Sequence, residues 1–373
     1  MTDNQKTMKA VVFRGPYNIE VEDKPIPQIT EPNQVIVKVL YSGLCGSDMH
    51  VYRGNVTPGP IGTIVGHEMI AQIYEIGSNI KNFQKGDKVI ANFSIQCGEC
   101  FYCKYGYTGQ CIKTNTFGKK GLDGCQAEYV LVPYAENVLS KIPENSTKDQ
   151  EIDDSVYLLM ADIFTTGYYG VKKIIDFFKI EQAEGYPKQE FKDISICQIG
   201  AGPVGLCALR ILKYFGFEKI VVIDSIESRL NEAKRLGAYK VINFETEPNE
   251  LKNFIQTDLN GLGFDAVLEV VGAPSALKTA YDAIRSNGFI SSLGMGHGSL
   301  PFNALELYLK NINLSVGRCH AWALFNESFT IFEKLKFSFN EFIDYKTSIL
   351  NAKEAFKLFD EHKVNKVVFD FTK

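Results

Sequence analysis

Two different rhythms of hydrophobic and polar positions divide the chain. Between residue 9 and about residue 140, short apolar runs alternate with Gly and Pro turns, as in QVIVKVLY (34–41), GDKVIANF (86–93) and AEYVLVP (127–133). Apolar runs of this length, bounded by turn residues, predict short strands. The first part of the chain is therefore expected to form a mainly β domain.

From about residue 165 the hydrophobic pattern predicts strands that alternate with helices. ISICQIG (194–200) leads into the helical pattern PVGLCALRILKYFG (203–216), and the strand pattern KIVVID (219–224) follows. The alternation continues through a helical pattern over SALKTAYDAIRS (275–286) to the strand pattern GFISSLG (288–294). Such alternation predicts an α/β domain, in which helices cover both faces of a doubly wound parallel sheet.

Two stretches fit neither rhythm clearly. IEQAEGYPKQEFKD (180–193) is polar and contains Gly185 and Pro187, which predicts an exposed loop insertion. After about residue 310, NINLSVGR (311–318) and KVVFDF (366–371) predict strands, with two helical patterns between them. The pattern alone leaves open which domain contains this tail.

Length and composition agree with two globular domains. A chain of 373 residues is too long for a single core of ordinary size, and 45% hydrophobic with 23% charged residues is typical of globular proteins. The formal net charge is −4, and the chain has no dense run of Lys and Arg. Nucleic acid is therefore not expected as a partner.

Compartment and membrane association follow from the apolar and cysteine content. The first ten residues, MTDNQKTMKA, lack the apolar core of a signal peptide, and no later stretch is apolar for long enough to span a bilayer. Four of the nine cysteines fall between positions 97 and 111, which fits metal binding in a reducing compartment better than a disulfide framework. We expect a cytoplasmic protein with no membrane partner.

The motif GAGPVG (200–205) lies between a predicted strand and a predicted helix. Gly200 would allow a tight turn, Gly202 a close approach of the backbone to a pyrophosphate, and Gly205 close packing of helix on strand. Pro203 and Val204 fall in the first helical turn, where the missing N–H of proline costs nothing. A glycine turn that serves packing alone is the alternative, but the order of strand, glycines and helix favours a dinucleotide site.

Asp224 closes the apolar run KIVVID, nineteen positions after Gly205. A carboxylate at this place accepts hydrogen bonds from ribose hydroxyls and repels a 2′-phosphate. The sequence therefore predicts NAD rather than NADP as the cofactor. The alternative is an acid that closes the strand by chance.

Four cysteines form the pattern C-x2-C-x2-C-x7-C in a Gly-rich stretch. Four thiolates at short spacings can surround a zinc ion tetrahedrally and leave no position for water, which indicates a structural rather than a catalytic zinc. A nucleic-acid-binding zinc module is the rival interpretation, and the acidic balance of the chain disfavours it. The predicted ligands are Cys97, Cys100, Cys103 and Cys111.

The stretch CGSDMH (45–50) combines a thiol, a hydroxyl, a carboxylate and an imidazole. Alone it is as typical of a polar loop as of an active site. GHE (66–68) supplies His67 and Glu68 from a separate strand-like segment. Because a catalytic zinc takes three protein ligands and keeps one position open, the two segments together indicate a metal site.

At this point the sequence resembles the zinc-dependent medium-chain dehydrogenases, the alcohol dehydrogenase family. CGSDMH, GHE, the four cysteines, GAGPVG and the acid after it occur in the family's order, so the resemblance covers nearly the whole chain. It implies a GroES-like catalytic domain made from residues 1–165 and 311–373. A Rossmann NAD-binding domain over residues 166–310 would be inserted between these two parts.

The resemblance also implies ligands for a catalytic zinc. Cys45 and His67 match two of them by motif. The third is expected where the chain enters the nucleotide domain, and there MADIFTTGYYG (160–170) offers Asp162. The better-known alcohol dehydrogenases have cysteine at this position, whereas other branches of the family use an acid.

Further roles are implied by the same motifs. Glu68 resembles a glutamate that can approach the metal transiently, and Asp48 resembles the carboxylate that accepts the other N–H of the histidine ligand. Ser47 and His50 resemble the family's proton relay. Thr166 resembles a threonine that packs near the nicotinamide.

These parts predict an oxidoreductase with two zinc ions per chain, one catalytic and one structural, which transfers hydride between NAD and an alcohol or its aldehyde or ketone. The resemblance implies a homodimer or homotetramer acting on a small molecule. A formaldehyde- or polyol-specific dehydrogenase of the same family is one alternative. A non-catalytic NAD-binding sensor with a structural zinc is another.

Overall fold

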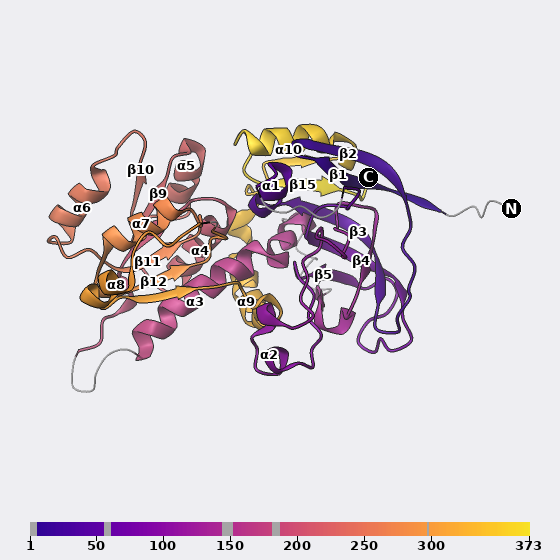
Figure 1. The fold of residues 1–373 in the computed structure, drawn as a ribbon, viewed down its shortest axis with the longest axis horizontal. Coiled ribbons are helices and arrows are strands. Elements are labelled where there is room, and N and C mark those ends of the chain that lie inside the picture. Colours follow the sequence, from indigo (N-terminus) through magenta and orange to yellow (C-terminus); the bar gives the residue numbers. More distant parts are fainter. Residues whose placement is uncertain (1–5, 56–60, 144–151, 181–186, 297) are drawn as a thin grey trace. The chain divides into compact units, whose positions relative to one another are not determined.

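The computed structural model describes residues 6–55, 61–143, 152–180, 187–296 and 298–373 (Figure 1). The chain divides into two compact units. The first unit contains residues 1–165 and 320–373, and the second contains residues 166–319. The first unit is thus drawn from both ends of the chain.

The first unit is mainly β. Strands β1 (Thr7–Gly15) and β2 (Asn18–Pro25) pair antiparallel, and β6 (Tyr129–Val132) pairs with one strand of a larger sheet. That larger sheet has the order β14 (Tyr345–Thr347), β15 (Val367–Asp370), β3 (Val35–Leu44), β4 (Glu68–Ile76), β5 (Lys88–Ala91) and β7 (Leu139–Lys141). The prediction of many short strands is confirmed.

The C-terminal segment contributes directly to the core of the first unit. Strand β15 runs antiparallel to β3 and pairs Val367 with Leu44. Helix α10 (Ala352–Asp360) buries Ala352, Ala355, Phe356 and Phe359 at helical spacing against this region, whereas its other face is exposed. Residues far apart in sequence therefore hold the end of β3 in a rigid apolar setting.

Other α-helices of the first unit connect or follow its strands. Helix α1 (Gly46–Tyr52) begins directly after β3, and α2 (Phe101–Lys104) lies in the cysteine-rich stretch. Helix α9 (Ala321–Leu335) opens the returning segment. Helix α3 (Ile163–Ile180) begins in the first unit and continues into the second.

The second unit is a doubly wound α/β domain, as the alternating pattern predicts. Its strands are all parallel in the order β10 (Lys240–Asn243), β9 (Lys219–Asp224), β8 (Ser195–Ile199), β11 (Phe264–Glu269), β12 (Ile284–Ser292) and β13 (Asn313–Val316). The helices between them are α4 (Pro203–Tyr214), α5 (Glu227–Arg235), α6 (Glu250–Asp258), α7 (Pro274–Ala283) and α8 (Ala304–Lys310). Strand order reverses beside β8, where such sheets bind their ligands.

The end of the second unit differs from the predicted boundary. Its last residue is 319, whereas the family resemblance implied a boundary after residue 310. The reason is that β13 pairs in parallel with β12, through Ser315 and Ser291 among others, and so completes the same sheet. A short apolar strand carries no local mark of the sheet that it joins.

Two local predictions also need adjustment. The helix predicted through Ser286 ends at Ala283, because Ile284 is already extended and begins β12. Of the loop predicted over residues 180–193, residues 181–186 lie outside the described part of the chain. Ile180 still belongs to α3, and Phe191–Asp193 form one 3₁₀ turn.

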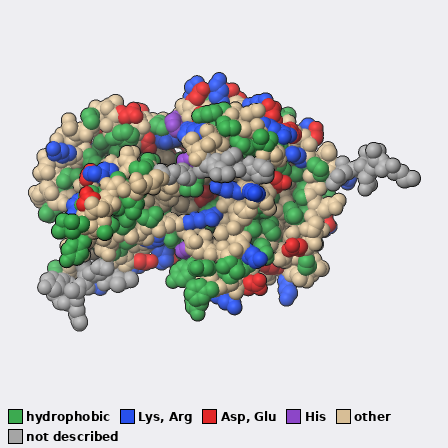
Figure 2. Space-filling model, viewed as in Figure 1, with side chains coloured by type: hydrophobic (Ala, Val, Ile, Leu, Met, Phe, Trp, Pro, Cys, Tyr) green, Lys and Arg blue, Asp and Glu red, His purple; other side chains and the backbone are tan. Residues whose placement is uncertain are grey.

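Surface charge and helix apolarity are the features that concern nucleic-acid and membrane partners. On the face shown in Figure 2, Lys and Arg side chains occur together with Asp and Glu side chains over both units. Among the helices in the described ranges, none combines the length and the apolarity needed to cross a bilayer.

Candidate metal and dinucleotide sites

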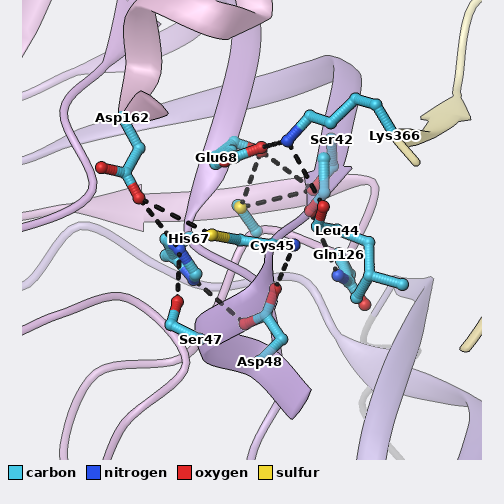
Figure 3. Close-up of polar contacts among 12 residues, drawn as sticks. Ser42, Leu44, Cys45, Ser47, Asp48, His67, Glu68, Gln126, Asp162 and Lys366 are labelled. Carbon is cyan, nitrogen blue, oxygen red and sulfur yellow. Dashed lines mark hydrogen bonds and ion pairs between the residues drawn. The ribbon is translucent and has the colours of Figure 1, made fainter. Parts of the chain in front are cut away.

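Three segments of the first unit bring four potential metal ligands together (Figure 3). Cys45 follows the last residue of β3 and caps α1, and His67 and Glu68 stand at the start of β4. Asp162 lies directly before α3. One donor atom from each of these four residues lies within 4.8 Å of every other.

The distances define which atoms face one another. Asp162 Oδ2 lies 3.9 Å from Cys45 Sγ and 3.5 Å from His67 Nε2. His67 Nδ1 lies 3.0 Å from Asp48 Oδ1, and because a carboxylate only accepts, Nδ1 carries the hydrogen. In the neutral form of His67 the lone pair is therefore on Nε2, the atom that faces Asp162.

Asp48 holds two of the predicted ligands at once. Its second oxygen, Oδ2, accepts a hydrogen bond of 3.0 Å from the backbone N–H of Cys45. A single buried carboxylate thus orients the His67 ring and fixes the start of α1. Partners of this kind commonly orient the ligands of a metal and tune its affinity.

The other residues to which the sequence assigned roles near this cluster are Ser47, His50 and Thr166. The Ser47 hydroxyl lies 3.2 Å from His67 Nε2. His50 lies three positions after Ser47 on α1, which places the two on neighbouring positions of one helix face. Thr166 lies on α3, four positions after Asp162. The roles of His50 and Thr166 stay predictions.

Glu68 has a partner that sequence reasoning missed. Lys366, fully buried next to the start of β15, forms an ion pair with Glu68 Oε2 and donates a 3.3 Å hydrogen bond to the carbonyl of Leu44. Burial alone would lower the pKa of Lys366, but the attraction of Glu68 outweighs it and raises that pKa. A lysine before an apolar run is ordinarily exposed, so nothing in the sequence pointed to this one.

The donor set fits a zinc ion. A thiolate, an imidazole and a carboxylate from Cys45, His67 and Asp162 are ligands that zinc accepts in tetrahedral geometry. Glu68 Oε1 is buried and has no hydrogen-bond donor among the described residues. Since a buried, unsatisfied carboxylate oxygen is costly, its position beside three further donors is best explained by a cation.

Protons compete with a metal for these atoms. Burial, followed by the negative charge of Glu68, raises the pKa of the Cys45 thiol. Burial alone would lower the pKa of His67, but the charge of Asp48 and a hydrogen bond with Asp162 hold it well above the ordinary value. A metal must therefore displace protons from both side chains near neutral pH.

From these shifts we expect the apparent zinc affinity of the Cys45 site to rise between pH 6 and pH 8. Each proton released contributes about a tenfold change per pH unit, so the release of one or two protons gives about a ten- to hundredfold change for each pH unit. Competition with a chelator of known affinity at three pH values measures the slope. The Cys45→Ala variant identifies which metal equivalent belongs to this site, and an affinity independent of pH would contradict the prediction.

The four predicted structural ligands also come together. The donor atoms of Cys97, Cys100, Cys103 and Cys111 all lie within 4.8 Å of one another. Cys111 Sγ lies 3.6 Å from Cys97 Sγ and 3.9 Å from Cys100 Sγ. A tetrahedron with zinc–sulfur bonds of about 2.3 Å has sulfur–sulfur edges of about 3.8 Å. The cluster therefore has the dimensions of a four-thiolate zinc site.

Backbone N–H groups stabilise negative charge on these sulfurs. Those of Cys97 and Lys113 each donate to Cys111 Sγ at 3.3 Å. Hydrogen bonds from the backbone of Ile112 and Cys103 lower the pKa of Cys100 to about 6. All nine cysteines of the chain are free thiols. Burial raises the pKa of Cys103 and of Cys111, so a metal must displace protons from these two thiols, whereas Cys100 already has thiolate character.

The glycine motif of the second unit forms the expected turn after β8. Gly200 has a φ of +103°, and a Cβ there would come within 2.9 Å of the side chains of Val270 and Val271. A Cβ on Gly205 would overlap the carbonyl oxygen of Gly200. Gly202 caps α4, with Pro203 and Val204 in its first turn. A phosphate at this helix start would face the backbone N–H groups of its first turn.

Asp224 stands at the end of β9 beside this turn. Its Oδ2 accepts a 2.7 Å hydrogen bond from the N–H of Ala201, and Oδ1 accepts hydrogen bonds of 2.8 and 3.0 Å from the N–H groups of Ser225 and Ile226. A carboxylate has about four acceptor positions, so about one is left for a ribose hydroxyl. Asp224 therefore braces the glycine turn as well as facing a possible ribose.

Comparison with known proteins gives a consistent result. Residues 31–144 match the alcohol dehydrogenase GroES-like domain, and residues 203–332 match the zinc-binding dehydrogenase domain. Zinc-type alcohol dehydrogenase B of Aspergillus flavus is 39% identical over 368 residues, covering 99% of this chain and 82% of that protein. An L-threonine 3-dehydrogenase of Protochlamydia amoebophila is 30% identical over 94% of this chain and 96% of its own length. The structure of an alcohol dehydrogenase from Thermus sp. ATN1 superposes with a TM-score of 0.86 at 29% identity, covering 97% and 99% of the two chains.

Proposed function

The chain belongs to the zinc-dependent medium-chain dehydrogenases, the alcohol dehydrogenase family, and on that premise we propose that it transfers hydride between NAD and an alcohol or the corresponding aldehyde or ketone. The observation that carries the proposal is the cluster of Cys45, His67 and Asp162, oriented by Asp48. A sensor that had lost its chemistry would have no need of this oriented donor set.

Zinc bound by Cys45, His67 and Asp162 would act as a Lewis acid that polarises the substrate oxygen and eases loss of its proton. The residues of the chain prepare this site. Asp48 keeps the hydrogen of His67 on Nδ1, so that Nε2 can bind a metal. The glycine turn and Asp224 would hold the cofactor by its pyrophosphate and ribose.

The proton released from an alcohol needs a path to solvent. We assign its first step to the Ser47 hydroxyl, which lies beside the ligand atom of His67. His50, three positions later on α1, would pass the proton on, because an imidazole can exchange protons near neutral pH.

Asp224 is the residue to which we assign the preference for NAD. Its negative charge would repel a 2′-phosphate, and its remaining acceptor position suits a ribose hydroxyl. Asp224→Asn is expected to lower the ratio of kcat/KM for NAD to that for NADP about tenfold, since one charge-assisted interaction is lost. Steady-state rates with both cofactors measure this ratio.

The ratio separates the charge of Asp224 from its bracing of the glycine turn, because a weakened turn affects both cofactors alike. Asp265→Asn is the matched control. Asp265 is a buried acid of the same unit that also accepts a backbone N–H, from Ser195 at 2.8 Å, but it stands at the start of β11. An equal ratio in the Asp224 variant and the unaltered protein would remove Asp224 from this role.

A rate panel on the purified protein tests the proposed function. NAD and NADP are each combined with primary alcohols, secondary alcohols, diols, polyols and formaldehyde, and formation of reduced nicotinamide is followed. L-Threonine belongs in the panel because one relative is an L-threonine 3-dehydrogenase. An NAD-linked rate supports the proposal, and the preferred substrate distinguishes a general alcohol dehydrogenase from a formaldehyde or polyol enzyme.

Metal content separates the enzyme from the sensor. The proposal requires two zinc ions per chain, and a sensor with a structural zinc alone requires one. If the protein holds two zinc ions and binds NADH but shows no activity with any substrate of the panel, the proposed reaction is contradicted. We also propose a homodimer or homotetramer without nucleic acid or membrane partners, which sedimentation of the purified protein tests.

A further inference from the structure

The buried pair of Lys366 and Glu68 belongs to no step described so far. Both side chains are completely inaccessible to solvent. Besides Glu68 Oε2, the ammonium of Lys366 contacts the carbonyl of Leu44, the residue directly before Cys45 (Figure 3). The C-terminal strand thus reaches both segments that supply metal ligands.

Hydrogen bonds hold the backbone of Glu68 in place, whereas its carboxylate can take a second position, nearer to the metal ligands. The Ser42 hydroxyl and the Cys125 thiol both donate to the Glu68 carbonyl, at 3.1 and 3.2 Å. Glu68 Oε1 has no donor in the described part of the chain. A donor oxygen of the same carboxylate lies within 4.8 Å of the ligand atoms of Cys45 and Asp162. A side-chain rotation alone could therefore bring it onto a metal held there.

The residues around the Glu68 carboxylate leave room for it beside Lys366. A Cβ on Gly43 would overlap Glu68 Oε2, so only glycine at this position leaves room for the ion pair. Gly43 pairs with Val368 of β15, two positions after Lys366. Three elements therefore combine to keep the carboxylate beside the ammonium.

If Glu68 binds the metal, a substrate cannot bind it at the same position. Zinc with three protein ligands keeps one position open, whereas four protein ligands close a tetrahedral site. We propose that Lys366 is a positioning residue that holds the Glu68 carboxylate off the metal and so keeps the fourth position available to the substrate. This inference rests on the metal site of the proposed function.

Removal of the ammonium should shift the carboxylate toward the metal. Without Lys366, Glu68 would be a buried charge without a partner, which proteins tolerate poorly. A cation bound by Cys45, His67 and Asp162 would then be its nearest source of compensation. If Glu68 occupied the metal nine-tenths of the time, an external ligand would bind about tenfold more weakly, since only the open fraction accepts it.

The experiment uses protein in which cobalt replaces zinc, because the visible spectrum of cobalt reports its ligands. Imidazole is the external ligand, since it is uncharged and removal of a lysine does not act on it directly. In Lys366→Met we expect a changed cobalt spectrum and imidazole affinity at least about tenfold weaker. Adding Glu68→Gln should restore the affinity to within about threefold, because a carboxamide is a poor ligand.

Two variants control for loss of a buried lysine in general. Lys336→Met removes another lysine of the same unit, 4% exposed, whose Nζ lies 2.9 Å from Tyr157 Oη, and it should leave imidazole binding unchanged. Lys366→Arg keeps the charge and should also stay close to the unaltered protein. If Lys366→Met does not fold, Lys366→Gln takes its place and is judged by the same criteria.

The outcomes separate this inference from the proposed function. Unchanged spectrum and imidazole affinity in the Lys366 variant, with cobalt bound, would overturn the positioning role and leave the dehydrogenase proposal intact. A loss of affinity that Glu68→Gln does not restore would overturn it as well. Failure of the unaltered protein to bind a second metal would count against the metal site itself.

Discussion

Replacing Cys45 by alanine is expected to lower kcat/KM for alcohol oxidation at least about a thousandfold while the fold remains. A metal that polarises the reacting oxygen supplies several kcal/mol of stabilisation to the transition state, and about 4 kcal/mol corresponds to a thousandfold in rate. Cys45 is one of only three side chains proposed to hold that metal permanently. The remaining permanent ligands, His67 and Asp162, are one fewer than the three protein ligands of a catalytic zinc.

The measurement is a pair of numbers, the rate with the preferred alcohol and the zinc content per chain. We expect zinc to fall from two to one, because the four-cysteine cluster is unaffected. Cys197→Ala is the matched control, since Cys197 is a completely buried thiol in β8, outside both donor clusters. A Cys45 variant with normal turnover, or a Cys197 variant with the same loss, would refute the assignment.

Replacing Cys111 by serine is expected to be the most destabilising single change in the first unit. Cys111 is 3% exposed, accepts two backbone N–H groups and lies against two further cysteines of its cluster. Loss of one ligand releases the metal and leaves buried polar groups without a partner, which costs about 3–5 kcal/mol. For a domain of this size, that corresponds to a Tm lower by about 10 °C.

Thermal unfolding followed by circular dichroism, together with zinc analysis, tests this expectation. Replacing a buried thiol by a hydroxyl lowers stability even where no metal binds. Cys197→Ser measures this loss of stability at a buried site outside both donor clusters. The Cys111 variant should lose clearly more stability than this control and should retain the zinc of the Cys45 site. Equal losses in the two variants would mean that the cysteine cluster does not depend on a metal.

The features that the sequence predicted well are local ones. The glycine turn needs only a strand, three glycines and a helix within twelve positions, and Gly200, Gly202 and Gly205 have the predicted places at the start of α4. The four cysteines lie within fifteen positions, so any compact turn brings them close. The family resemblance, now confirmed, linked these local motifs to one fold.

Other features could not be predicted, because they depend on which strands become neighbours. The strand at Asn313–Val316 joins the parallel sheet, although its sequence would suit either unit. The helix that ends at Ala283 stops where the next residue is drawn into β12. In both cases pairing with a distant strand outweighs the local preference.

By itself, the sequence determined the types of chemistry and their order along the chain: a thiol and an imidazole for a metal, four thiolates for another, and a glycine turn with an acid for a dinucleotide. The tertiary structure decided which of these groups meet. Asp162 lies more than a hundred positions from Cys45, and Lys366 lies almost three hundred from Glu68, yet each pair is in contact. The physical reason is that the burial of β3 between β4 and β15 places their ends together, and a buried charge is then stable only beside the partner that this packing provides.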